Sequence, residues 1–387
     1  MVKLNVHNFM KKITTYVHPE RGFLPDPDPL LELPLAYRAW DELNNAMPEL
    51  LHNNDFRDAL NNIPQLDPSG IKNGPELDRS MRQLSMFANA YVNWGEEPVK
   101  SIPANLAIPL WEIAHRSGRP PIASHASIVL SNWRRIDPDG PIAPENLKTL
   151  QNFFGGKDED WFYLATVGVE SVGGCAMSKL FYCLDSIKNN KSNIVVTSLN
   201  DLASIIHKIN LALERMYEHC RADIFYHRVR PFLKGWPDDG IVYEGVNEEP
   251  KIFFGGSAAQ SSLLQTLDAG LGITHPSDKS GPFLIQMRKY MPPNHSKVIS
   301  LLELDPILLK YLNKNKSIEL KDAYKKCISG LNIFRKKHLE MAIHYISDQE
   351  KKGEEGEGTG GTEFITFLTT ARKETHFVNG KRIIRNF

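Results

Sequence analysis

The chain has 387 residues, more than the ~250–300 at which a single hydrophobic core stops growing, so we expect two domains. Its 46 basic and 46 acidic side chains leave no net charge, which argues against a nucleic-acid-binding protein because such proteins need a basic face. No run of ~18 apolar residues occurs, so the sequence predicts no membrane-spanning helix. The first residues lack the apolar core of a secretory signal, and the four cysteines form no CxxC pair. We therefore expect a cytoplasmic protein whose cysteines (Cys175, Cys183, Cys220 and Cys327) are reduced and buried.

Helical patterns dominate the first third of the chain. A proline-rich stretch over 18–34 predicts an extended, ordered loop. Apolar residues at helical spacing then predict helices over 35–51 and 76–94. Prolines between 103 and 145 are expected to break the chain into short pieces, and we place the domain boundary in this zone, near residue 140.

The second part of the chain is predicted to be longer and more helical. Residues 160–187 combine an apolar pattern with several glycines, which are unfavourable inside a helix. The glycines indicate either a bulky group against that face or close helix–helix packing, and the sequence does not choose between the two. Ser198 with Asp201 resembles a capping box that opens a helix running to about Tyr226. The charged and glycine-rich stretch 348–362 predicts a mobile loop.

The last long helix is predicted over 319–349 and contains two histidines. His338 lies on its apolar stripe, seven residues after Leu331 and seven before Tyr345, so it should point into the core. Six further residues turn a helix by about 600°, so His344 should face water. A core histidine is either satisfied by hydrogen bonds or binds a metal or haem iron.

Three basic residues precede His338 by less than one turn: Arg335, Lys336 and Lys337. They form either a solvated face or partners for acidic groups at the rim of a bound cofactor, such as haem propionates. Composition and spacing leave both readings open.

Six stretches, in order along the chain, resemble the indoleamine 2,3-dioxygenase family. They are NLAIPLWEIAHRSGRPPI (105–122), NWRRIDP (132–138), GIVYEG (240–245), FFGGSAAQSSLLQTLDAGLGI (253–273), MRKYMPP (287–293) and GTGGT (358–362). The resemblance implies an all-α fold in which a small N-terminal domain (1–140) covers the distal side of a large helical haem-binding domain (141–387). It also implies haem b as cofactor and a reaction that inserts both atoms of dioxygen across the indole C2–C3 bond of L-tryptophan, giving N-formylkynurenine.

The same resemblance assigns roles to individual residues. His338 matches the proximal ligand of the haem iron, and Arg335 with Asp268 matches a proximal basic–acidic pair. Residues matched to the distal pocket and the substrate site are Phe162, Thr166, Phe225, Tyr226, Arg230, Ser257, Ala258, Thr359 and Gly360. Arg230 is matched to the arginine that holds the substrate carboxylate, and Thr359 with Gly360 to the loop that closes over the substrate.

The chain departs from the family pattern at the distal side. His125 stands where animal members usually have tyrosine, and Ile128 where a pocket cysteine is common. Tyr226 replaces a phenylalanine, and Thr166 a serine. An imidazole at the distal side could hydrogen-bond the indole N–H or bound dioxygen, as in the related tryptophan 2,3-dioxygenases, so we count His125 with Thr166 as candidate catalytic residues.

Three alternatives to tryptophan dioxygenation remain at this stage. One is a related haem enzyme that oxidises or rearranges a substituted indole in secondary metabolism. Another is a non-catalytic oxygen-binding haem protein of the same fold, and the third is a haem-free helical scaffold. For the leading reading we expect a monomer that needs an electron donor to keep its iron ferrous.

Overall fold

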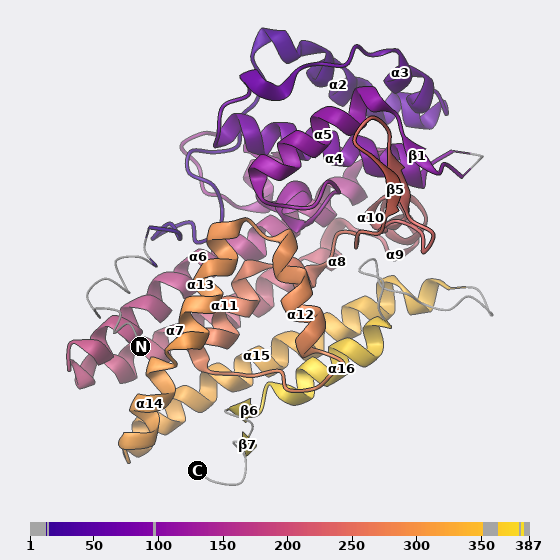
Figure 1. Ribbon diagram of the computed structural model, residues 1–387. Helices are drawn as coiled ribbons and strands as arrows, with labels where there is room; N and C mark the ends of the chain where they lie inside the picture. The colour runs from indigo at the N-terminus through magenta and orange to yellow at the C-terminus, as the bar shows by residue number, and fades with distance from the viewer. Residues whose placement is uncertain (1–12, 14, 96–97, 351–362, 379–380, 383–387) are drawn as a thin grey trace.

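The computed structural model describes residues 13, 15–95, 98–350, 363–378, 381 and 382. Figure 1 shows two layers, in which helices from the first third of the chain lie above a bundle that contains the longest helices. The described chain is predominantly helical with a few short strands, which confirms the predicted fold class. No helix among these residues is long and apolar enough to cross a membrane.

The upper layer begins with the predicted helices. The chain forms η1 (Leu35–Tyr37), α2 (Arg38–His52), α3 (Phe56–Asn62), η2 (Pro68–Gly70), α4 (Pro75–Asn93) and α5 (Ala104–Ser117), then the π-helical turn η3 (Ala126–Leu130) and the 3-10 turn η4 (Pro144–Asn146). The helices predicted over 35–51 and 76–94 are confirmed by η1 with α2 and by α4.

The expectation that prolines break this region into short pieces is wrong for α5, which runs through Pro109. A proline removes one backbone hydrogen bond and crowds the carbonyl four residues earlier. Leu106, Leu110 and Ile113 are all fully buried on one face of this helix. The free energy gained by burying these three side chains outweighs the loss of one backbone hydrogen bond at Pro109.

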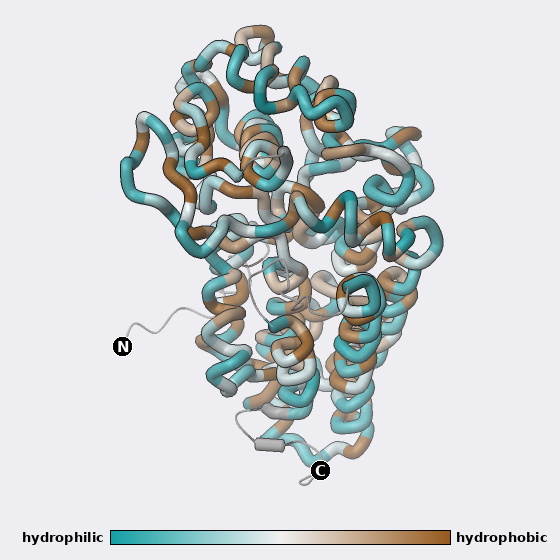
Figure 2. Tube along the Cα trace, turned by 90° about the vertical axis from the view of Figure 1, so that its right-hand side faces the viewer, coloured by the Kyte–Doolittle hydropathy of each residue, from teal (hydrophilic) through white to brown (hydrophobic). Residues whose placement is uncertain are grey.

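The lower bundle is built on three long helices: α6 (Lys157–Lys188), α7 (Ser192–Glu214) and α15 (Ile318–Tyr345). Helix α7 packs extensively against both α6 and α15. In Figure 2 the long helices run side by side through the lower half, and hydrophobic and hydrophilic residues alternate along them. Shorter elements complete the bundle: α8 (Met216–His219), α9 (Ala222–Ile224), η5 (Phe225–Val229), α10 (Arg230–Leu233), η6 (Ala258–Gln260), α11 (Ser262–Leu271), α12 (Gly281–Met287), η7 (Arg288–Tyr290), α13 (Pro293–Leu304), α14 (Ile307–Lys314), η8 (Ser347–Gln349) and α16 (Phe364–Glu374).

The prediction of a helix that opens at Ser198 and runs to about Tyr226 is wrong. Ser198 is buried within α7, which begins at Ser192 and ends at Glu214. Val195, Leu199 and Leu202 are fully buried at helical spacing, so the apolar face starts before the supposed cap.

The short strands join parts of the chain that are far apart in sequence. β1 (Ser101–Ile102) pairs in parallel with β4 (Ile241–Tyr243), which pairs antiparallel with β5 (Asn247–Lys251). Two further antiparallel pairs are β2 (Trp133–Arg135) with β3 (Leu147–Thr149), and β6 (Phe377–Val378) with β7 (Lys381–Arg382). The β1–β4 pairing connects the two predicted domains, and the boundary near residue 140 stays a prediction.

The glycines of α6 provide close packing. A Cβ added at Gly174 would lie 2.5 Å from the backbone oxygen of Glu20, and one at Gly173 would lie 2.3 Å from a side-chain carbon of Leu263. At Gly173 the neighbour is α11, as the helix–helix alternative predicts, whereas at Gly174 it is the N-terminal loop, which the sequence did not predict. The cysteine prediction is wrong at one position, because Cys175 is exposed, whereas the other three cysteines are buried; all four are free.

Candidate active site

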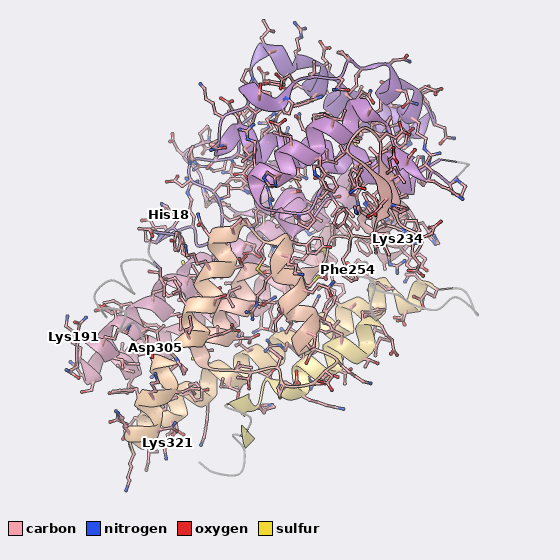
Figure 3. All side chains as sticks on the ribbon, viewed as in Figure 1. His18, Lys191, Lys234, Phe254, Asp305 and Lys321 are labelled. Carbon is pink, nitrogen blue, oxygen red and sulfur yellow. The ribbon has the colours of Figure 1, made fainter. Side chains whose placement is uncertain are left out.

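A largely apolar cavity lies between α6, α15, η3, η5 and the segment around η6. Its empty volume is about 1180 Å³, including its open mouth. The described residues that line it are His125, Ile128, Val129, Phe162, Ala165, Thr166, Val169, Glu170, Leu213, Met216, Phe225, Leu233, Gly256, Ser257, Ala258, Ser261, Leu264, Phe334, His338, Met341, Ala342, Tyr345 and Ile346. In Figure 3, Phe254 lies near the junction of the two layers, whereas Lys191 and Lys321 lie at the far end of the bundle. Phe254 precedes the lining residue Gly256 by two positions in the chain.

Helix α15 presents His338 to this cavity. Phe334, His338, Met341 and Tyr345 follow helical spacing and all line the cavity, so one face of the helix forms its wall. His344 is exposed and faces away, as the stripe predicts. The sequence therefore assigned both histidines to the correct sides of the helix.

The His338 ring has an environment that suits a metal ligand. No hydrogen bond or ion pair joins it to any other residue in the described part of the chain, and its only aromatic neighbour there is Phe334, with ring centroids 6.2 Å apart. Burial, with a smaller contribution from the Arg335 charge, lowers the pKa of His338 to about 4. The ring is therefore neutral near pH 7 and keeps a nitrogen lone pair for a metal.

These residues fit a haem. Within the described ranges, no group of three or more His, Cys, Asp or Glu side chains could hold a metal ion directly. An iron bound by His338 would therefore take its other ligands from a cofactor. An unpartnered imidazole on the wall of an apolar cavity is what a haem with one protein ligand requires.

The predicted pair Arg335–Asp268 belongs to a larger, partly buried cluster. Arg335 Nη2 donates to Asp268 Oδ2 at 2.5 Å, and its Nη1 donates to Thr375 Oγ1 at 2.9 Å. His275 lies between two carboxylates, with Nε2 3.1 Å from Asp268 Oδ2 and Nδ1 3.0 Å from Glu374 Oε2. The cluster joins α11, α15 and α16 on the side of α15 next to His338.

The charges in this cluster shift one another's pKa. Burial acts to raise the pKa of Asp268, but the Arg335 charge and the bonds to His275 outweigh it, so the pKa is lowered. Burial acts to lower the pKa of His275, but its hydrogen bonds to Asp268 and Glu374 outweigh it, so the pKa is raised. His275 and Glu374 were missed from the sequence because neither belongs to a motif and they meet only through the fold.

Of the two lysines after Arg335, Lys336 is exposed and Lys337 is half-buried, and each pairs with a glutamate. Lys336 Nζ lies 3.6 Å from Glu340, and Lys337 Nζ lies 2.7 Å from Glu214. These contacts fit the solvated-face reading for the lysines, whereas Arg335 is half-buried in the cluster.

The opposite wall is aromatic. Phe162 and Phe225 have ring centroids 4.8 Å apart, and Phe225 meets Tyr345 edge-on at 5.6 Å. Thr166, one turn after Phe162, donates its hydroxyl to the Phe162 carbonyl at 2.8 Å. Phe162, Thr166 and Phe225, matched to the pocket by resemblance, are thus brought together on the cavity wall.

The segment from Gly256 to Ala258 forms a backbone edge of the cavity. Ser257 caps η6 with its side chain, which accepts from the Ala259 N–H at 3.2 Å. Gln260 completes the cap by accepting from the Ser257 N–H at 3.3 Å. The cap holds Ser257 and Ala258 in place at the cavity.

Three polar groups meet at the distal side. His125 Nε2 lies 2.9 Å from Glu170 Oε1, and Ser261 Oγ donates to the same oxygen at 2.7 Å. The His125 backbone N–H donates to Gln260 Oε1 at 2.9 Å. Glu170 and Ser261 were missed from the sequence, although Glu170 follows Phe162 and Thr166 at helical spacing and could have been found by that signal.

Tyr226 and Arg230 are not among the described residues that line the cavity. Both lie at or next to η5, the π-helical turn that carries Phe225, and the Arg230 guanidinium carbon lies 5.1 Å from the Tyr226 ring centroid. Arg228 is directed elsewhere, over the Phe154 ring at 5.0 Å. Thr359 and Gly360 lie outside the described residues, as does most of the predicted loop 348–362.

Comparison with known proteins agrees with this site. Residues 12–378 match the model of the family described as Indoleamine 2,3-dioxygenase. Indoleamine 2,3-dioxygenase 1 of Mus musculus is 35% identical over 90% of this chain and 91% of its own. Indoleamine 2,3-dioxygenase 2 of Homo sapiens is 35% identical over 93% of each chain. A protein named myoglobin, of Haliotis madaka, is 30% identical over 97% of this chain and 99% of its own.

These matches span nearly the whole chain and confirm the resemblance drawn from the six motifs. The cavity and the His338 face of α15 fall inside the matched residues. The chain therefore belongs to the indoleamine 2,3-dioxygenase family, whose members are haem-dependent oxidoreductases that act on indoles with dioxygen.

Proposed function

We propose that the protein inserts both atoms of dioxygen across the C2–C3 bond of the L-tryptophan indole, giving N-formylkynurenine, with haem b as cofactor. The observation that carries the proposal is the unpartnered His338 ring on the wall of an apolar, aromatic-lined cavity. The family membership supports an indole substrate and dioxygen as co-substrate.

In this proposal His338 binds the iron from the α15 side. The haem, when bound, supplies the redox chemistry of dioxygen, and the protein binds and orients the reactants. Arg335 and Asp268 position the His338 helix through their partly buried ion pair. A single protein ligand leaves the opposite face of the cavity for substrate.

The distal residues bind the substrate. Phe162 and Phe225 pack against the indole ring, beside the backbone of Ser257 and Ala258. Arg230 binds the substrate carboxylate, with the Tyr226 ring against its guanidinium group. Such charge-assisted hydrogen bonds are stronger than neutral ones and fix the indole in one orientation, which supplies much of the rate.

One further assignment concerns polar contacts. His125 and Thr166 orient the substrate at the distal side. The protein acts as a monomer and takes electrons from an external donor that keeps its iron ferrous.

The test is a product analysis with isotopically heavy dioxygen. The haem-loaded protein is reduced without oxygen, L-tryptophan and heavy dioxygen are added, and the product mass is measured. Incorporation of both heavy atoms into N-formylkynurenine is the expected result. Incorporation of a single heavy atom would instead support a monooxygenase acting on an indole.

A second candidate is an oxygen-binding protein without catalysis. It is favoured by one observation, the 30% identity to a protein named myoglobin over nearly the whole chain. An oxygen carrier needs no group that binds an amino-acid carboxylate, so the buried Arg230, five residues after the cavity-lining Phe225, argues for the enzyme. Reversible oxygen uptake with no loss of tryptophan would identify the carrier.

A further inference from the structure

A second cavity lies between the N-terminal loop, η3 and the start of α13. Its empty volume is about 980 Å³, including its open mouth. Ala126 and Leu130 of η3 line it, whereas Ile128 and Val129 of the same turn line the cavity beside His338. The two cavities share no described lining residue, so the proposed reaction does not use this one.

Arg119 is the only arginine or lysine among the described residues that line this second cavity. Its side chain is 3% exposed, and the one hydrogen bond of that side chain in the described part of the chain joins Nη2 to Asp78 Oδ1 at 3.3 Å. Nε and Nη1 have no partner there and are not sealed from water, so they open onto the cavity. A guanidinium group with most of its donors unused is a ready partner for an anion.

The charges around Arg119 leave one positive charge unbalanced. Arg79 pairs with Asp41, and Arg119 pairs with Asp78. Arg82, four residues after Asp78 on α4, is fully buried and donates only to a backbone carbonyl, at 2.5 Å. Its Nε and Nη2 have no partner within the described ranges. Three guanidinium groups therefore share two carboxylates, and a buried charge without a counter-charge is costly.

The other titratable groups on the cavity lining do not supply the missing negative charge. Asp26 is already paired with Arg21 at 3.3 Å, and His18 lies 3.3 Å from the same carboxylate. His295 is neutral near pH 7, because desolvation, with a smaller contribution from the Arg119 charge, lowers its pKa to about 3. No group on the described lining therefore neutralises the extra positive charge.

The rest of the lining suits an organic molecule better than an inorganic ion. The rings of Phe23 and His295 both line the cavity, with centroids 4.6 Å apart. Leu130 and Pro292 add apolar surface. Cavities of this size that combine apolar walls with a few polar groups typically bind small organic ligands.

We infer that this cavity is a second ligand site, which binds a small organic carboxylate. The carboxylate pairs with Arg119, and the apolar body of the ligand packs against Phe23 and Leu130. The inference does not depend on the proposed function, because none of these residues takes part in it.

The experiment uses benzoate as the probe and benzamide as its neutral counterpart of the same shape. Each is titrated into the haem-loaded protein, reduced and kept under nitrogen, and the heat of binding is recorded. We expect benzoate to bind at one site per chain and at least about tenfold more tightly than benzamide, because only the carboxylate forms charge-assisted hydrogen bonds. Inorganic phosphate, which lacks an apolar body, should bind more weakly than benzoate.

Substitutions then assign the binding to Arg119. Arg119→Leu should lower the affinity for benzoate by at least about tenfold. Asp78→Asn should raise it about two- to fivefold, because the competing carboxylate loses its charge, and a misfolded protein could not produce this gain. Arg116→Leu is the matched control, since Arg116 donates to the Pro68 and Ile71 carbonyls and does not line the cavity. It should leave the affinity at its wild-type value.

Three results would overturn the inference: no measurable binding of benzoate, equal affinity for benzoate and benzamide, or wild-type affinity in Arg119→Leu. An affinity that is lost in Arg230→Leu but kept in Arg119→Leu would place benzoate in the cavity beside His338 and would also overturn it. Tighter binding of phosphate than of benzoate would contradict an organic ligand. Oxidation of tryptophan is measured separately, so none of these results decides the proposed function.

Discussion

No residue in the described part of the chain forms a hydrogen bond or an ion pair with the His338 side chain. A half-buried imidazole without a hydrogen bond is unfavourable, and desolvation lowers its pKa to about 4, so the ring stays neutral. Such a ring gains stability when a metal binds its lone pair. The chemistry of the site therefore depends on this one residue more than on any other.

Replacement of His338 tests this directly. His338→Ala should yield folded protein that retains far less than stoichiometric haem, because the cavity loses its only imidazole on the α15 face. His344→Ala, on the exposed face of the same helix, should retain haem. Haem absorbance relative to protein concentration measures both, and the opposite pattern would refute the assignment.

Arg230 offers a second test at the level of one side chain. Arg230→Leu should raise the KM for tryptophan by about 10–100-fold, the loss expected when a carboxylate loses its charged partner, with the haem spectrum unchanged. Arg228→Leu is the matched control, because Arg228 packs over Phe154 and contacts His52. Steady-state kinetics measure the KM of both variants. An unchanged KM in Arg230→Leu would show that Arg230 does not bind the substrate carboxylate.

The sequence predicted the direction of individual residues well where a helix set it. The 3.6-residue period separated His338 from His344, and Phe162 and Thr166 were matched to the cavity wall through the family resemblance. The same period could have found Glu170. Ser261 and His275 could not have been found in this way, because their partners come from other segments and no local pattern links them.

At the scale of elements, α16 is held to α11 and α15 by side chains of opposite charge. Glu374 on α16 accepts from the Ser277 N–H and the Ser280 hydroxyl, at 2.8 and 2.5 Å, and contacts His275. His275 in turn contacts Asp268, which is paired with Arg335. The position of α16 thus depends on the charge of a histidine.

This dependence predicts a pH effect on stability. The pKa of His275 is raised above its ordinary 6.5, so the stabilisation from its charge is complete below pH 6.5 and is lost as the pH rises through the raised pKa. The pKa values of Asp268 and Glu374 are lowered, so their contribution is present above about pH 4.5 and is lost as the pH falls further. The cluster is therefore most stabilising between these limits.

The measurement is the free energy of urea unfolding as a function of pH. The wild-type protein should lose stability as the pH rises above 6.5, and His275→Gln should lose most of that dependence. A profile for His275→Gln that parallels the wild-type profile would show that other groups cause it.

The contact between α6 and the N-terminal loop gives a further prediction. Gly174→Ala should lower the free energy of unfolding by about 1–3 kcal/mol, because the new Cβ meets the backbone of residues 20–22, which cannot move aside easily. Gly168→Ala is the control, since its Cβ would lie 3.0 Å from the Pro144 ring, a looser contact than the 2.5 Å to backbone at Gly174. Urea denaturation should show a larger loss of stability for Gly174→Ala than for Gly168→Ala. Equal losses would mean that the backbone of residues 20–22 shifts to accommodate the new Cβ.

Element boundaries were predictable where apolar residues recur without interruption. Helices α2, α4, α6 and α15 were found within a few residues of their ends. The start of α7 was missed because a serine–aspartate pair resembles a cap even when it lies in the middle of a helix. The disruption expected from Pro109 in α5 was overestimated, because burial of one face of the helix compensates for the missing hydrogen bond.

At the scale of the whole molecule, the two layers are joined by backbone as well as side chains. β1 from the first part of the chain pairs with β4, and Asn89 donates to the Phe232 carbonyl at 2.8 Å. In the second part of the chain both links end between residues 232 and 243, which precede the cavity edge at Gly256. The fold class and family were predictable because six motifs span the chain, whereas these long-range pairings left no trace in any one motif.

The central claim is that the protein oxidises tryptophan with dioxygen in the cavity beside His338. The most direct measurement records both reactants in one vessel that contains reduced, haem-loaded protein. We predict that dioxygen and L-tryptophan disappear in equal molar amounts as N-formylkynurenine forms. Dioxygen that is bound and released again while the tryptophan concentration stays constant would contradict the claim.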